Sequence, residues 1–162
     1  MLFYSLRHIA VFPIQKNDGV RSEIIRKAQY EDTLQLERLF QFTRQKTFAS
    51  RPLGEFQIGD YQQSTNDDKV WVFEKDGFIV GFVSVYLPDS FIHNLCVHPD
   101  HQRQGIGRRL LHIAESHLTC PMTLKIAMDN LKVSEFYKKQ GWYQVSIHDD
   151  KKEPYTLYGK DT

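Results

Sequence analysis

A glycine-containing loop, Gln102 to Gly107, constrains this chain more than any other segment. It follows an apolar run that ends at Val97 and a turn at Pro99, and it leads into an amphipathic helix. A loop between a strand and a helix N-terminus directs several backbone N–H groups toward one point, at the positive end of the helix dipole. Glycine lets an anion approach the backbone where a Cβ would block it. The sequence therefore predicts a phosphate or pyrophosphate site on a strand–loop–helix unit.

The loop differs from the two commonest phosphate-binding loops. A Walker A loop has four residues between its glycines and then Lys and Ser or Thr, and this segment has neither feature. The dinucleotide fingerprint has a third small residue three positions after the second glycine, where this chain has Leu110. Arg103, Arg108 and Arg109 add positive charge around the turn. A tight turn without a ligand is the alternative for a lone glycine pair.

The composition is that of a soluble single domain. Of the 162 residues, 41% are hydrophobic and 25% are charged, which suffices for a core. The formal net charge of +1 provides no field that would draw the chain to nucleic acid or to an anionic membrane. Cys96 and Cys120 lack the spacing of a disulfide framework or zinc site, which favours the cytoplasm. The apolar start is too short to span a bilayer, so residues 1–22 are expected to form an arm or extra strand and residues 23–162 a single domain.

Hydrophobic periodicity and turn signals predict a mixed α/β fold. Strands are expected near residues 24–28, 70–73, 78–87, 91–97, 123–128, 142–147 and 155–158, and helices from residue 30, over 108–118 and over 130–140. The segment 51–65 reads as a broken helix or a loop. The strand–helix–strand unit from Phe91 to Met128 is expected to be a right-handed parallel crossover. These elements predict a sheet of six to seven strands, mostly antiparallel, with helices on both faces.

Two separated motifs resemble those of the GNAT superfamily of acetyl-CoA-dependent N-acetyltransferases. The first is the Gln102-x-x-Gly105-x-Gly107 loop with the strand end and proline, Leu95 to Pro99, before it. The second comprises Asn130, Val133, Phe136-Tyr137 and Gly141-Trp142. The resemblance spans residues 24–158. It implies a GNAT-like sheet that is splayed at the strand before the loop, with acetyl-CoA as co-substrate in that cleft and no metal.

The resemblance also implies roles for individual residues. Backbone groups of Leu95, Cys96 and Val97 would pair with the pantetheine arm, and loop N–H groups would hold the pyrophosphate. Asn130 would form a hydrogen bond near the thioester or the pantetheine. The implied cofactor-binding set is Leu95, Cys96, Val97, Gln102, Arg103, Gln104, Gly105, Ile106, Gly107, Arg108, Arg109, Asn130 and Tyr137.

Acetyl transfer to an amine requires a base, because an amine with a pKa near ~10.4 is mostly protonated at pH 7. His93 is predicted as this base, directly or through a water, since the ordinary pKa of histidine, about 6.5, suits the task. By alternation it shares a strand face with Phe91, Leu95 and Val97, so packing in a half-buried face is the alternative. Glu55 and Asp60 are weaker candidates.

Tyr137 is implied to stand near the sulfur, where a phenol can protonate the departing thiolate. Its alternative role is packing, because it lies in a helical stripe of apolar residues. His98, Asp100 and His101 resemble metal ligands, but a turn beside a phosphate loop often carries such residues, so no metal is expected.

The predicted activity is transfer of the acetyl group of acetyl-CoA to an amine by direct attack in a ternary complex. A small-molecule acceptor is favoured over a protein lysine or N-terminus. The alternative from another class is an acyl-CoA-binding sensor without catalysis. No nucleic-acid or membrane partner is expected, and the exposed final hairpin and the apolar arm leave a homodimer open.

Overall fold

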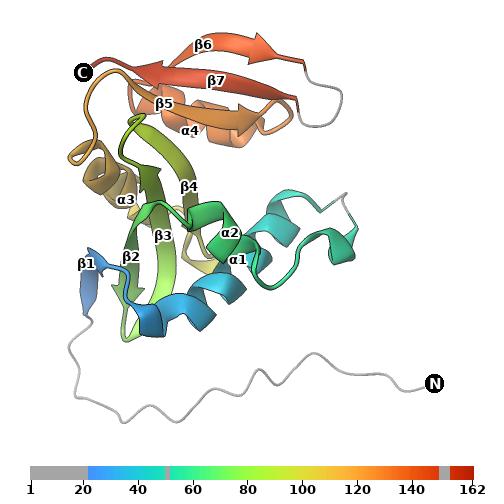
Figure 1. The fold of residues 1–162 in the computed structure, drawn as a ribbon, viewed down its shortest axis with the longest axis vertical. Helices are drawn as coiled ribbons and strands as arrows, with labels where there is room; N and C mark the ends of the chain where they lie inside the picture. Colours follow the sequence, from blue (N-terminus) through green and yellow to red (C-terminus); the bar gives the residue numbers. More distant parts are fainter. Residues whose placement is uncertain (1–21, 50–51, 150–153) are drawn as a thin grey trace.

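The computed structural model describes residues 22–49, 52–149 and 154–162, which form one seven-stranded sheet with helices on both faces (Figure 1). The strands are β1 (Glu23–Lys27), β2 (Lys69–Lys75), β3 (Phe78–Tyr86), β4 (Phe91–Val97), β5 (Met122–Ala127), β6 (Tyr143–His148) and β7 (Tyr155–Lys160). The α-helices are α1 (Thr33–Thr47), α2 (Asp60–Thr65), α3 (Ile106–Glu115) and α4 (Leu131–Lys139). Single turns of 3-10 helix are η1 (Tyr30–Asp32), η2 (Leu53–Glu55) and η3 (Pro99–His101).

The strand order is β1-β2-β3-β4-β5-β7-β6, and every neighbouring pair is antiparallel except β4 and β5. The α3 helix joins these two parallel strands, as the crossover prediction requires. The β2–β3 turn has positive φ at both central residues, 52° at Asp76 and 82° at Gly77. This geometry suits the twist of a hairpin, and Asp-Gly is a residue pair that adopts it readily.

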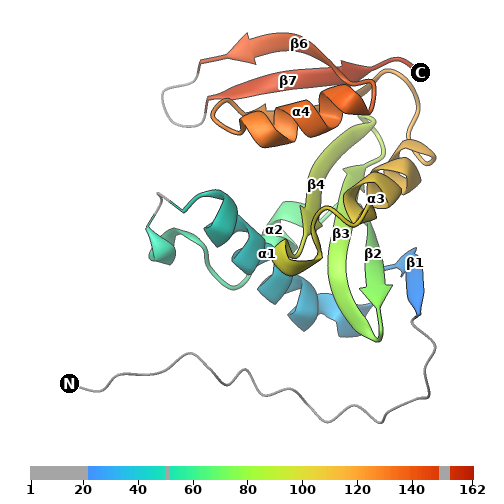
Figure 2. The ribbon, with the colours of Figure 1, turned by 180° about the vertical axis from the view of Figure 1, so that it is seen from behind.

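The sheet lies between two groups of helices (Figures 1 and 2), and each group packs on it through a separate apolar core. On one face, α3 and α4 pack through residues such as Leu110, Leu111 and Tyr137. On the other face, α1 and α2 pack through residues such as Phe40 and Tyr61. The predicted mixed α/β class with helices on both faces is therefore confirmed. The sheet carries α1 and α2 on one side of β4 and holds α4 beside β5.

The structure settles two points that the sequence left open: the conformation of residues 52–65 and the position of the last strand in the sheet. The ambiguous segment contains η2 and then α2, and α2 begins after Gly59 at a φ of 103°. The last strand, β7, lies inside the sheet between β5 and β6, which no local pattern indicated. The proposed arm over residues 1–22 lies, except for its final residue, outside the described residues. None of the described helices is long and apolar enough to cross a membrane.

Close packing of α3 on the sheet depends on Gly81. A Cβ at this position would lie 3.0 Å from the Cys96 carbonyl oxygen and 3.0 Å from Leu110 Cδ1. We expect Gly81→Ala to lower the free energy of unfolding by about 1–3 kcal/mol, because the backbone oxygen cannot move aside. Chemical denaturation measures this change. Gly54→Ala is the matched control, since a Cβ there meets no atom of a described residue within 4 Å, and an equal loss in both variants would contradict the prediction.

Candidate active site

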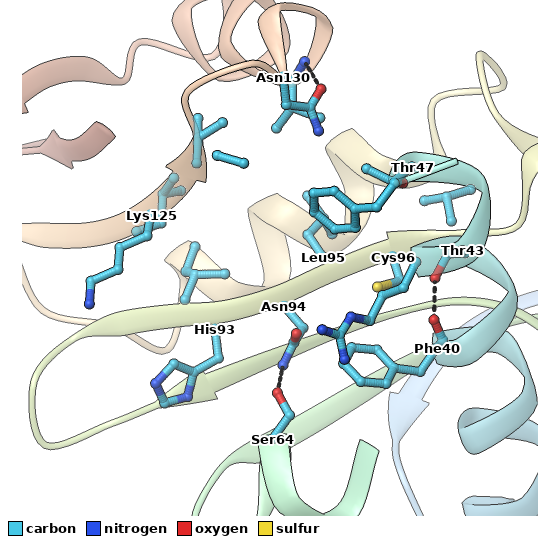
Figure 3. Close-up of a pocket in the computed structure, with 18 of the residues that line it drawn as sticks. Phe40, Thr43, Thr47, Ser64, His93, Asn94, Leu95, Cys96, Lys125 and Asn130 are labelled. Atoms are coloured by element: carbon cyan, nitrogen blue, oxygen red, sulfur yellow. Dashed lines mark hydrogen bonds between the residues drawn. The ribbon is translucent and has the colours of Figure 1, made fainter. Parts of the chain in front are cut away.

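The sheet opens into a cleft between β4 and β5. These strands are paired only at Phe91 with Thr123 and at Ile92 with Leu124. Beyond Ile92 they diverge, and side chains from α1, α2, β4, β5 and α4 line a cleft of about 680 Å³ (Figure 3). The splay implied by the resemblance is therefore present, at the strand before the glycine loop.

The alternation of β4 decides which backbone groups face this cleft. The His98 N–H donates to the Val80 oxygen at 2.8 Å. Because backbone groups in an antiparallel pair point alternately toward and away from the neighbouring strand, every second residue of β4 before His98 directs its N–H and C=O to β3. Backbone groups of Leu95 and Val97 therefore point away from β3 and into the cleft. Those of Cys96 point to β3, which corrects the expectation that all three residues offer their backbone. Cys96 lines the cleft through its side chain.

A bulge in β4 moves His93 away from two of its expected neighbours, Leu95 and Val97, while Phe91 stays beside it. Ser84 pairs with Asn94 and Val85 pairs with Ile92, so His93 is an extra residue in β4. His93 consequently lies on the side of Asn94: its Nδ1 is 2.8 Å from Asp68 Oδ1, while Asn94 Nδ2 donates to Ser64 in α2 at 3.0 Å. The alternation that placed His93 with Leu95 and Val97 was wrong, because a bulge shifts the period by one residue. The imidazole is 40% exposed and lines the cleft.

The glycine loop carries a run of unpaired N–H groups. Arg103 and Gly105 have φ values of 64° and 81°, and Gly105 is the N-cap of α3. Within the described part of the chain, no N–H from Arg103 to Arg108 donates to a protein acceptor, whereas the N–H of Arg109 donates to the Gly105 oxygen at 3.1 Å. Six consecutive unpaired donors at a helix N-terminus, with left-handed residues among them, are the arrangement with which protein backbones bind anions.

Two side chains of the loop form hydrogen bonds that hold it in place, whereas Arg109, in the first turns of α3, points away from the cleft. Gln102 Nε2 donates to the Val97 oxygen at 3.1 Å, and Gln104 Oε1 accepts from Lys75 at 3.0 Å. Arg109 forms an ion pair with Glu23 at 2.7 Å and lies over the Phe73 ring. The Arg109 side chain is thus directed to β1 and β2, contrary to its predicted place in the cofactor site. The Ile106 side chain is buried in the core, so the part of this residue that remains for a ligand is its unpaired backbone N–H.

Asn130, the N-cap of α4, and Tyr137, within α4, both line the cleft. Asn130 Oδ1 accepts the Val133 N–H at 3.3 Å as the helix cap, and Figure 3 shows its Nδ2 turned toward the cleft. Tyr137 is 6% exposed and packs edge-on against Phe136 and Trp142. Burial is the main cause that raises the pKa of Tyr137 above its ordinary value, with smaller contributions from Cys96 and Glu115. The phenol therefore keeps its proton at neutral pH.

Several residues that line the cleft carried no signal in the sequence. Thr43, Arg44 and Thr47 come from α1, Ser64 from α2 and Lys125 from β5. The weaker base candidates Glu55 and Asp60 also line the cleft. Asp60 accepts the Gln57 N–H at 2.9 Å and lies 3.4 Å from Arg44. Asp68, which contacts His93, was not identified because the two residues are 25 positions apart.

The cluster that resembled metal ligands is engaged otherwise. His98 Nδ1 accepts the Asp100 N–H at 3.2 Å, and the His98 ring stacks on Phe42 at 5.1 Å. Among the residues described, no group of three or more His, Cys, Asp or Glu side chains is placed to hold a metal ion.

Comparison with known proteins bears on the identity of this fold and cleft. A peptidyl-lysine N-acetyltransferase of Escherichia coli (strain K12), YiaC, is 33% identical over 75 residues, which are 46% of this chain and 50% of YiaC. The chain thus spans about half the length of this curated relative.

Solved structures resemble the whole domain at low identity. PaiA N-acetyltransferase of Thermoplasma acidophilum in complex with coenzyme A has a TM-score of 0.69 at 20% identity, over 86% of this chain and 99% of that chain. The ribosomal-protein-S18-alanine N-acetyltransferase of Escherichia coli has a TM-score of 0.67 at 16% identity, over 86% and 94%. The model of the acetyltransferase (GNAT) family matches residues 33–142, which include the glycine loop and the α4 motif. This chain belongs to the GNAT acetyltransferase family.

Proposed function

We propose that this protein transfers the acetyl group of acetyl-CoA to a primary amine by direct attack in a ternary complex. The observation that carries the proposal is the run of unpaired N–H groups from Arg103 to Arg108, directly after Gln102, which lines the cleft. A diphosphate would accept from these donors without a metal. Family membership and the coenzyme A complex of PaiA N-acetyltransferase support the same ligand.

The cleft fits an extended thioester. The backbone groups of Leu95 and Val97 offer hydrogen bonds as an unpaired strand edge does, which suits the two amides of a pantetheine arm. Gln102 already donates to the Val97 oxygen, so that side chain would yield or share this acceptor. Asn130 Nδ2 would donate from the α4 side. When bound, acetyl-CoA supplies an acetyl group activated as a thioester.

His93 and Tyr137 would divide the proton transfers. At pH 7 about one amine in a few thousand is neutral, so His93 Nε2 would accept the proton that the amine must lose. The Tyr137 hydroxyl, which burial keeps protonated, would donate its proton at the sulfur. Burial also raises the pKa of the Cys96 thiol to about 11. Cys96 is therefore a poor nucleophile at neutral pH, which favours direct attack over an acyl-cysteine route.

A small-molecule amine is the acceptor we propose first, and a peptide lysine is the second candidate because the curated relative is a peptidyl-lysine N-acetyltransferase. Thiol release from acetyl-CoA, measured with polyamines, amino acids and lysine peptides, tests both, with mass spectrometry of the products. We expect thiol release with at least one class. Tight coenzyme A binding without thiol release for all classes would instead identify an acyl-CoA sensor.

A further inference from the structure

We propose that Asp68 is a positioning residue that holds the His93 ring in its Nδ1–H tautomer, so that Nε2 is the basic atom presented to the cleft. This inference rests on the proposed acetyl transfer to an amine. Asp68 lies between α2 and β2, whereas His93 is the bulge residue of β4. The two residues therefore meet only through the tertiary fold.

The contact between the two side chains is close and specific. His93 Nδ1 lies 2.8 Å from Asp68 Oδ1 and 3.0 Å from Oδ2. An ionised carboxylate only accepts hydrogen bonds, so the proton of this contact must be on Nδ1. In the neutral ring this leaves the lone pair on Nε2. No other described residue forms a hydrogen bond with the His93 ring, so none of them engages Nε2.

The surroundings fix both partners. The Asp68 side chain is 2% exposed, and its backbone N–H donates to the Thr65 oxygen at 3.0 Å. The Phe91 and Tyr86 rings lie 4.9 and 6.1 Å from the imidazole. A buried carboxylate aligned in this way orients the ring and stabilises the positive charge that the ring acquires when Nε2 takes a proton.

The bulge supplies the geometry that this arrangement needs. In a regular strand His93 and Asn94 would point to opposite faces, but the extra residue puts both on the side of α2. His93 also lies two residues before Leu95, where the cleft-facing backbone of β4 begins. Two residues of strand span about 7 Å, which places the imidazole next to the reactive end of a thioester laid along that edge.

The tautomer of His93 is measurable without any turnover. Long-range proton–nitrogen correlation spectra of the full chain labelled with ¹⁵N-histidine, at a pH where the ring is neutral, distinguish the two forms. The His93→Gln spectrum identifies the signals. We expect the Nδ1–H form in the native protein and a shift to the Nε2–H form in Asp68→Ala. A native protein in the Nε2–H form would overturn the proposal. Asp68→Leu, which is branched at the same carbon and has no hydrogen-bonding atom, replaces Asp68→Ala, with the same expected shift, should that variant fail to fold.

Kinetics then separate positioning from a merely structural contact. We expect Asp68→Ala to lower kcat by about 10- to 100-fold, through a misaligned base, while KM for acetyl-CoA changes less than about twofold. In the His93→Gln background the same change should cost less than about twofold, because the residue that Asp68 positions is gone. Asp67→Asn, at the exposed neighbouring position, is the matched control and should leave kcat unchanged.

The outcomes distinguish this inference from the proposed function. Equal losses of kcat from Asp68→Ala in the two backgrounds, or full kcat in His93→Gln, would show that the contact only anchors the loop before β2, and would overturn the proposal. A protein that transfers no acetyl group to any amine would refute the proposed function, yet its spectra would still report the His93 tautomer.

Discussion

Replacing Gly105 with alanine is expected to weaken coenzyme A binding by about 10- to 100-fold. Gly105 adopts a φ of 81° in the middle of the six unpaired N–H groups. A Cβ there would project into space that none of the described residues fills within 4 Å, and this is the space we assign to the diphosphate. Losing one charge-assisted hydrogen bond costs roughly 1.5–3 kcal/mol, which corresponds to that range of affinity. Titration calorimetry measures the dissociation constant.

Gly77→Ala is a close control for this experiment. Gly77 has nearly the same φ, 82°, and a Cβ there also meets no atom within 4 Å in the part of the chain that the structure describes, but it lies in the β2–β3 hairpin. Both variants should lose similar stability, about 1–2 kcal/mol, because an L-residue is strained in the left-handed region. Unchanged coenzyme A affinity in Gly105→Ala, or the same loss in Gly77→Ala, would mean that the loop does not hold the diphosphate.

Tyr137→Phe is expected to lower kcat by about 10²- to 10⁴-fold, the usual contribution of a general acid. The substitution keeps the ring that packs against Phe136 and Trp142, so coenzyme A affinity should change little. Steady-state kinetics with the best acceptor, together with calorimetry, separates the two effects. An unchanged kcat would assign Tyr137 to the core alone.

The pH dependence adds a second check on Tyr137. Burial disfavours the phenolate, so the pKa of Tyr137 is raised and the proton is retained as the pH increases. Activity should therefore show no alkaline loss attributable to this phenol below about pH 10, the ordinary pKa of tyrosine. Tyr61→Phe is the matched control: Tyr61 is also 6% exposed and burial raises its pKa to about 12, but it does not line the cleft. This variant should keep its kcat.

Local patterns predicted most elements because each of them depends on neighbouring residues. The β4 strand has the predicted bounds, and Gly141 ends α4 with a φ of 84°, as a glycine after a helix should. The glycine loop was identified for the same reason, since its N–H groups, its left-handed residues and the helix N-terminus all lie within a few positions. The parallel crossover followed from the order of elements and the handedness of the connection.

Local patterns gave wrong predictions where contacts between distant segments decide the position of a side chain or a backbone group. The β4 bulge depends on how β3 pairs with β4, so alternation along one strand could not reveal that His93 turns toward Asp68. Arg109 is 86 positions from Glu23, and its charge alone suggested the wrong destination. Similarly, the Cys96 backbone points to β3 and not into the cleft because of how β3 and β4 pair, as the hydrogen bond between His98 and Val80 shows.

By itself the sequence determined the order of helices and strands, the hairpin turns and the glycine loop before α3, because these follow from side-chain periodicity and backbone preferences over short distances. Only the tertiary structure decided that β4 and β5 part beyond Ile92 and that five separate elements line one cleft. The tertiary structure also decided that the Arg109 side chain points to β1 and β2 and not into the cleft. These features depend on pairing and packing between residues far apart in the chain, where many arrangements satisfy the same local pattern and the buried contacts select one.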